Sequence, residues 1–245
     1  MNDDLYLSVI LPAYNEEKLI RSTLNEVCGY LSAQNYTSEI IIVNDGSVDG
    51  TAKILDDIVR NAKNMKVINN PENRGKGYSV RRGMLEAGGK YRLFMDADNS
   101  TDIKEIKKFL ELLEGGVDAV IGDRTLENSV ILLHQPTYKK ILGNIGNVFI
   151  RSLTVPGIKD TQCGFKCFTG KLVRDVFPVL GIDRWAFDVE ILALALKRGY
   201  RIKNIPVVWK NRSESKVKVI DYVLTFADLV RIKINLLTNK YERAK

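Results

Sequence analysis

Histidine and cysteine are scarce in this 245-residue chain, and their scarcity excludes several kinds of site. The only histidine, His134, cannot build a histidine-based metal site, and we expect it at the surface or at a helix entry. The three cysteines, Cys28, Cys163 and Cys167, are an odd number without the spacing of zinc ligands. They predict reduced thiols in a cytosolic protein rather than a disulfide framework.

Long apolar runs are also absent, since no stretch is both long enough and apolar enough to span a bilayer. The first four residues are partly acidic and lead into a predicted strand, so we expect neither a signal peptide nor a transit peptide. The net charge of +7 predicts a polyanionic partner such as a nucleotide, a nucleic acid or an anionic membrane surface. Because the basic residues form no single block, a nucleic-acid partner is not expected.

The first half of the chain repeats one pattern four times: an apolar strand, a polar loop and an amphipathic helix. The strands are expected at residues 7–11, 39–43, 65–69 and 91–95. This order is typical of an α/β fold in which a mostly parallel sheet carries helices on both faces. Ligands of such sheets bind beyond the carboxyl ends of the strands.

Polar residues follow each of these predicted strand ends. They are Tyr14 and Glu16 after the first strand, Asp45 after the second and a glycine-rich loop containing Lys76 after the third. In that loop, glycines allow backbone N–H groups to approach a phosphate. We therefore expect these loops to form one binding site.

Asp96 and Asp98 follow the fourth strand and are separated by one residue. On an extended backbone, residues two apart point to the same side, so both carboxylates could bind one hard cation. Mg²⁺ or Mn²⁺ would fit, because such ions take one or two carboxylates together with a substrate's phosphates. The alternative is a solvated turn in which Asn99 and Ser100 cap the next helix.

The second half contains two segments with amphipathic periodicity. Residues 136–153 form either a core-packed helix or a helix at a membrane surface. The tail from residue 217 to 237 is a helix whose polar stripe is only one residue wide, and the remainder is apolar. Such a helix either packs on two partners or lies in a membrane interface.

Four motifs of the first half, residues 9–16, 44–47, 73–77 and 96–98, resemble the family-2 glycosyltransferases with the GT-A fold. Two further motifs, residues 160–166 and 184–190, are most similar to dolichyl-phosphate β-glucosyltransferases, with dolichol-phosphate mannose synthases second. The resemblance covers nearly the whole chain. The Gln-x-x-Arg-Trp motif of processive polysaccharide synthases is absent, because Gly181 stands where its glutamine would be.

The resemblance implies a role for each residue that matches these motifs. Asp98, Asp160 and Arg124 are implied in catalysis, and Asp96 and Asp98 in binding Mg²⁺ or Mn²⁺. The residues implied in binding the nucleotide sugar are Pro12, Ala13, Tyr14, Glu16, Asp45, Lys76, Asp96, Ala97, Lys210 and Lys216.

The function implied is an inverting transfer of a sugar, glucose-like, from a UDP-sugar, or alternatively a GDP-sugar, to a polyprenyl phosphate. One alternative is a hydroxyl acceptor, for which Asp160 or Asp188 would have to remove a proton. Another is a nucleotide-sugar-binding module without catalysis.

We expect one GT-A domain over residues 1–215, divided into a nucleotide-sugar half (1–115) and an acceptor half (116–215). Residues 216–245 would form an amphipathic tail that holds the enzyme peripherally on the cytoplasmic face of a membrane. A homodimer that buries the same apolar face is the competing explanation for the tail.

Overall fold

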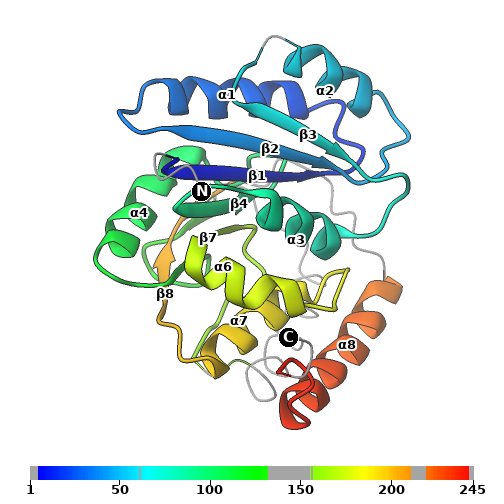
Figure 1. Ribbon diagram of the computed structural model, residues 1–245, viewed down its shortest axis with the longest axis vertical. Helices are drawn as coiled ribbons and strands as arrows, with labels where there is room; N and C mark the ends of the chain where they lie inside the picture. The colour runs from blue at the N-terminus through cyan, green and yellow to red at the C-terminus, as the bar shows by residue number, and fades with distance from the viewer. Residues whose placement is uncertain (1–4, 61, 132–154, 156, 211–218, 243–245) are drawn as a thin grey trace.

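A seven-stranded, mostly parallel sheet organises the molecule, with strand order β3-β2-β1-β4-β7-β5-β8 (Figure 1). The computed structural model describes residues 5–60, 62–131, 155, 157–210 and 219–242. Only β7 runs antiparallel to its two neighbours, β4 and β5. The strands of the sheet are β1 (Leu7–Ala13), β2 (Ser38–Asn44), β3 (Met65–Asn69), β4 (Tyr91–Met95), β5 (Ala119–Asp123), β7 (Phe165–Thr169) and β8 (Ile202–Pro206).

Helices cover both faces of this sheet, as expected for the α/β class. Figure 1 shows α1 and α2 on one side and α3, α6 and α7 on the other. Two apolar cores match these layers, one between the sheet and α1 and α4, and one between the sheet and α3, α6 and α7. The helices are α1 (Ile20–Ser32), α2 (Thr51–Val59), α3 (Lys76–Glu86), α4 (Ile106–Glu114), α6 (Gly170–Val176), α7 (Phe187–Lys197) and α8 (Val219–Leu237), with short 3₁₀ helices η1 (Ile103–Glu105) and η2 (Phe177–Val179).

The four predicted strands of the first half are confirmed, and β1 is longer than expected. It continues through Pro12 to Ala13, and both residues pair with β2. β4 pairs with β1 only as far as Ile10. Pro12 therefore has a strand on one side only, where a residue without an N–H group is tolerated.

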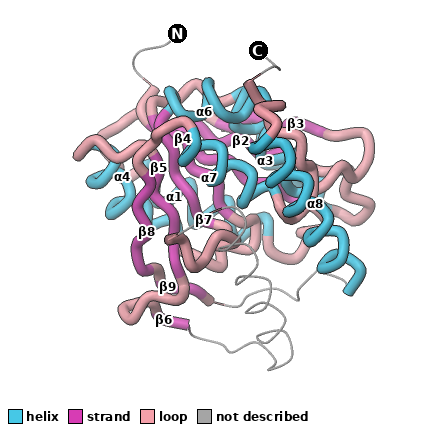
Figure 2. Tube along the Cα trace, turned by 90° about the horizontal axis from the view of Figure 1, so that it is seen from below, coloured by secondary structure: helices cyan, strands magenta, loops and turns pink. Residues whose placement is uncertain are grey.

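The second half adds a smaller sheet beside the carboxyl end of the large one. β6 (Val130–Ile131) and β9 (Val208–Trp209) pair in parallel and project from the body of the molecule (Figure 2). An isolated bridge joins Trp209 to Thr101, just after the paired aspartates. This bridge brings the end of the last strand against the loop that follows β4. The predicted helix at 136–153 lies outside the described residues.

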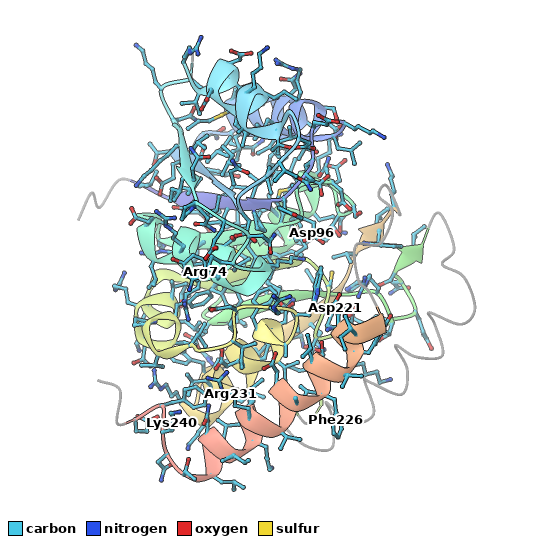
Figure 3. The ribbon with its side chains drawn as sticks, turned by 90° about the vertical axis from the view of Figure 1, so that its right-hand side faces the viewer. Arg74, Asp96, Asp221, Phe226, Arg231 and Lys240 are labelled. Carbon is cyan, nitrogen blue, oxygen red and sulfur yellow. The ribbon has the colours of Figure 1, made fainter. Side chains whose placement is uncertain are left out.

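The C-terminal helix α8 packs on α7 as the outermost layer (Figures 1 and 3). Leu229 and Ile232 are buried in the same core as α3, α6 and α7. Asp221, from the predicted polar stripe, is also buried, at 8% exposure. Much of the apolar surface of α8 faces outward instead, at Ile220, Val223, Leu224, Phe226, Val230, Ile234 and Leu237. In the described part of the chain, no helix is long and apolar enough to cross a membrane.

Candidate active site

The paired aspartates follow β4 in a turn rather than on an extended strand end. The Asn99 N–H donates to the Asp96 carbonyl oxygen over 3.0 Å, and Asn99 has a φ of 51°. Asp98 Oδ1 accepts a hydrogen bond of 2.9 Å from the Ser100 N–H. Asn99 and Ser100 do not cap the next helix, because Asp102 is the N-cap of η1. The predicted extended backbone at Asp96 and Asp98 is therefore wrong, and the alternative is right about the turn but not about its capping residues or its exposure, because Asn99 and Ser100 are buried.

Lys76 lies against the first of the two carboxylates. Its Nζ atom is 2.6 Å from Asp96 Oδ1. Burial alone would lower the pKa of Lys76, but the charges of Asp96, Asp188 and Asp98 raise it above the usual value. Lys76 therefore remains a cation. Its ion pair with Asp96 joins the glycine-rich loop, which follows β3, to the paired aspartates, which follow β4.

Gly164 closes the other side of Asp96. The Asp96 N–H donates to the Gly164 carbonyl oxygen over 3.0 Å. A Cβ atom at Gly164 would lie 1.9 Å from Asp96 Oδ2, so no other residue fits without moving the carboxylate. The residue belongs to a motif that carries the family resemblance, but its contact with Asp96 arises only because β7 lies beside β4.

Asp45 organises the glycine-rich loop from within the protein. It is 3% exposed, and its Oδ1 atom accepts hydrogen bonds from Asn70 Nδ2 at 2.7 Å and the Arg74 N–H at 3.0 Å. Its Oδ2 atom accepts from the Gly75 N–H at 2.8 Å. Through these hydrogen bonds Asp45 holds the backbone of the loop that precedes Lys76 in place.

The loops after β1 and β2 are joined to each other. The Asp45 N–H donates to the Ala13 carbonyl oxygen over 2.8 Å. The Asn15 N–H donates to Ser47 Oγ, and the Glu16 N–H donates to Thr51 Oγ1. The predicted pocket residues Pro12, Ala13, Tyr14 and Glu16 therefore adjoin Asp45 at the carboxyl edge of the sheet. Ala97 is buried there as well, and its carbonyl oxygen accepts from Thr23.

Arg124 and Asp160 form a bidentate pair. Arg124 Nε and Nη2 donate to the two Asp160 oxygens at 2.7 and 2.9 Å, and the Arg124 N–H donates to Oδ2 at 3.0 Å. Burial would raise the pKa of Asp160, but the Arg124 charge outweighs it and holds that pKa below the usual value. The Arg124 guanidinium also lies 5.5 Å from the Trp209 ring centroid. Asp160 therefore positions Arg124 and is a poor proton acceptor.

Lys166 and Asp188 form a second buried pair. Lys166 is 0% exposed, and its Nζ atom is 2.6 Å from Asp188 Oδ1. Burial raises the pKa of Asp188 above its usual value. The charges of Lys166 and Lys76 lower that pKa, but their effect is smaller than that of burial. Lys166 has no role assigned from sequence. Its position between Cys163 and Cys167 gives no signal of this pairing, because Asp188 lies 22 residues further along the chain.

Of the two lysines of the second half that are expected to bind phosphate, only Lys210 lies within the described residues. The Lys210 N–H donates to the Ser100 carbonyl oxygen over 2.7 Å, so its backbone adjoins the turn that contains Asp98. Lys216 lies outside the described residues. Figure 3 shows Asp96 and Arg74, a residue of the glycine-rich loop, above α8.

The donor set around Asp96 and Asp98 fits a divalent cation held jointly with a ligand. Among the described residues no group of three or more histidine, cysteine or acidic side chains could hold a metal ion alone. Two carboxylates are nevertheless enough for Mg²⁺ or Mn²⁺ when substrate phosphates complete the coordination. Asp98 and Asp96 are the residues that would hold such an ion.

Comparison with known proteins agrees with this geometry. The glycosyl transferase family 2 model matches residues 8–176. A dolichyl-phosphate β-glucosyltransferase from Dictyostelium discoideum is 38% identical, over 96% of this chain and 76% of that protein. Enzymes of the same name from Saccharomyces cerevisiae and Homo sapiens are each 32% identical, over 100% and 96% of this chain and 79% and 77% of theirs.

Solved structures share the fold at low identity. Glucosyl-3-phosphoglycerate synthase from Mycobacterium tuberculosis, in complex with Mn²⁺, UDP and phosphoglyceric acid, superposes with a TM-score of 0.70 at 14% identity, covering 95% of this chain and 78% of that one. Mannosyl-3-phosphoglycerate synthase from Rubrobacter xylanophilus gives 0.66 at 18% identity, covering 96% and 75%. The GT-A fold expected from sequence is confirmed, and the chain belongs to glycosyltransferase family 2.

Proposed function

We propose that the protein transfers a glucose-like hexose, with inversion, from a UDP-sugar to a polyprenyl phosphate. The names of the relatives support this acceptor class. The observation that carries the proposal is the state of the two carboxylates that could act as general bases. Asp160 is bound by Arg124 and Asp188 by buried Lys166, each through a charged hydrogen bond. A nucleophile that needs no base is therefore favoured.

A phosphate monoester is such a nucleophile. By analogy with phosphorylated side chains, its second pKa is about 6, so it is mostly a dianion at pH 7. It requires cations that hold it near the donor rather than a group that removes a proton. Arg124 is suited to this role because its guanidinium keeps its charge and has N–H donors beyond the two that Asp160 binds. A hydroxyl acceptor would need a base, but the pKa of Asp160 is lowered by Arg124, and Asp188 is only 4% exposed and bound to Lys166.

The donor diphosphate would be bound at the same carboxyl edge of the sheet, beside Lys76 and the paired aspartates. Lys76, the amides of the glycine-rich loop, Lys210 and Lys216 would bind its oxygens. A divalent cation on Asp96 and Asp98 would stabilise the negative charge that develops on the leaving nucleoside diphosphate. UDP is the favoured carrier, since the matched relatives are named glucosyltransferases, and GDP is the alternative.

The acceptor is a lipid, which makes the outward face of α8 relevant to the function. Val223 is 64% exposed, Phe226 48% and Ile234 53%. Figures 1 and 3 show that the first turn of α8 is its end nearest the carboxyl edge of the sheet. We propose that this face contacts the cytoplasmic surface of a membrane, with basic residues attracting anionic lipid head groups. The active site would then meet an acceptor phosphate at that surface.

The test compares two acceptors that differ only in the phosphate. The protein is incubated with radiolabelled UDP-glucose, Mn²⁺ and either a polyprenyl phosphate or the dephosphorylated polyprenol of the same length. We expect label to move into the organic extract with the phosphate alone, and EDTA to abolish the transfer. Glucosylation of the polyprenol at a comparable rate would instead establish a hydroxyl acceptor and contradict the proposal.

A further inference from the structure

Glu190 is a buried carboxylate that neither the catalytic centre nor the metal site uses. It lies in α7 and is 1% exposed. Its Oε2 atom accepts hydrogen bonds from the Gly181 N–H at 3.1 Å and the Ile182 N–H at 2.9 Å. Its Oε1 atom accepts from the Tyr241 hydroxyl at 2.8 Å. Glu190 thus joins the turn before α7 to the C-terminal segment.

The turn that Glu190 holds lies directly against the glycine-rich loop. The Tyr78 N–H donates to the Asp183 carbonyl oxygen over 3.0 Å. Gly75 has a φ of +106°, and a Cβ atom there would lie 2.5 Å from the same oxygen. A Cβ atom at Gly77 would lie 2.6 Å from the Ile182 carbonyl oxygen. The backbone after Gly181 therefore determines the shape of the loop that carries Lys76.

Tyr241 belongs to a C-terminal segment that is fastened to α7 at several points. Lys197 Nζ donates to the Leu236 carbonyl oxygen at 2.6 Å and to Asn239 Oδ1 at 2.7 Å. Arg198 lies 3.5 Å from Glu242. The Tyr241 ring is 3% exposed, and its hydroxyl is the part of the segment that reaches Glu190. The segment follows α8 directly, so its position depends on how α8 is docked.

We propose that Glu190 is a positioning residue for the donor site, and that Tyr241 makes its position depend on the docked C-terminal helix. Two backbone N–H groups and one hydroxyl hold the Glu190 carboxylate in one orientation. The carboxylate in turn holds the backbone of residues 181–183, and that backbone contacts residues 75–78. Donor binding is therefore coupled to α8, the helix proposed to contact the membrane. This inference rests on the proposed nucleotide-sugar site.

The test compares Tyr241→Phe with a matched control, Tyr200→Phe. Tyr200 also donates to a carboxylate, Asp175 Oδ2 at 3.1 Å, and Asp175 lies in α6, where it pairs with Arg198 at 3.3 Å. Both variants lose one hydroxyl–carboxylate hydrogen bond. We expect only Tyr241→Phe to weaken UDP binding, measured by calorimetry with Mn²⁺, by about 3- to 10-fold. The KM for the acceptor should stay unchanged.

Glu190→Gln provides a second variant: its amide oxygen can still accept from the Gly181 and Ile182 N–H groups, but without the charge these hydrogen bonds are weaker. We expect a larger loss of UDP affinity than with Tyr241→Phe. Hydrogen exchange provides a readout that needs no ligand: the amides of Tyr78, Gly181 and Ile182 should exchange faster in Tyr241→Phe and not in Tyr200→Phe.

Two results would overturn the inference: unchanged exchange at these amides in Tyr241→Phe, or equal loss of UDP affinity in both tyrosine variants. Wild-type protein that binds no UDP contradicts the proposed function instead. In that case the exchange measurement still decides whether Glu190 and Tyr241 position the loop.

Discussion

At the scale of single residues, the acidic groups near the site differ in their partners. Asp96 is paired with Lys76, Asp160 with Arg124 and Asp188 with Lys166. Asp98 accepts a backbone N–H from a residue two positions ahead. An asparagine can accept the same hydrogen bond, so the charge of Asp98 can be removed without removing its local structure.

Asp98→Asn is expected to lower kcat by about 100-fold or more, because the charge that would hold the cation is lost. The melting temperature should change little. Asp102→Asn is a close control, since Asp102 Oδ1 accepts from the Lys104 N–H at 3.0 Å, as Asp98 does from Ser100. Turnover and melting temperature are measured for both variants in a Mn²⁺ titration. Near-normal turnover in Asp98→Asn would remove Asp98 from the metal site.

At the scale of elements, β7 completes the site. It runs antiparallel between β4 and β5, and the turn that precedes it carries Gly164 to the Asp96 carboxylate. Its own residue Lys166 binds Asp188 of α7. One strand of five residues therefore joins the first half of the chain to the second half at the edge of the sheet where Asp96 lies.

Gly164→Ala should displace the Asp96 carboxylate, because the new methyl group would overlap it. We expect a destabilisation of about 1–3 kcal/mol together with a strong loss of activity. Gly29→Ala in α1 is the control, since no atom lies within 4 Å of a Cβ atom there. Chemical denaturation and turnover are compared for the two variants. Wild-type activity in Gly164→Ala would show that Asp96 tolerates displacement.

At the scale of the whole molecule, α8 buries Leu229 and Ile232 but leaves most of its other apolar side chains exposed. Asp221 of its polar stripe is buried, while Val223 and Phe226 are exposed. Figure 3 labels Asp221 and Phe226 on this helix. A row of exposed apolar residues on one helix is unusual for a protein surface and indicates an interaction site. The division of the chain at residue 215 stays a prediction, although Leu229 and Ile232 of α8 share the core of the preceding helices.

Val223→Glu combined with Phe226→Glu should abolish sedimentation with anionic liposomes, because two charges would enter the apolar contact. Activity on long-chain acceptors should fall, while UDP affinity stays unchanged. Leu85→Glu is the control, since Leu85 is 45% exposed on α3. Size-exclusion chromatography distinguishes the alternative: a double variant that changes only from dimer to monomer would identify α8 as a subunit interface.

The sequence by itself determined the four parallel strands of the first half and the carboxyl edge of the sheet, where their loops meet. Apolar runs and helical periodicity are local signals, so the four parallel strands and the loops with Asp45, Lys76, Asp96 and Asp98 were predictable. The rule that ligands bind beyond parallel strand ends then predicted that these loops meet. Their contacts confirm that proximity, while the ligands assigned to each residue stay predictions.

Only the tertiary structure decided how charges and buried faces are paired. Neither the antiparallel direction of β7 nor the partners of Asp160, Asp188 and Glu190 follow from local periodicity, because each pair joins residues far apart in the chain. The same holds for α8, whose narrow polar stripe left open whether the helix packs on two partners or lies in a membrane interface. The side it buries depends on its anchoring to α7 through Lys197 and Tyr241, since long-range packing outweighs the pattern of a single helix.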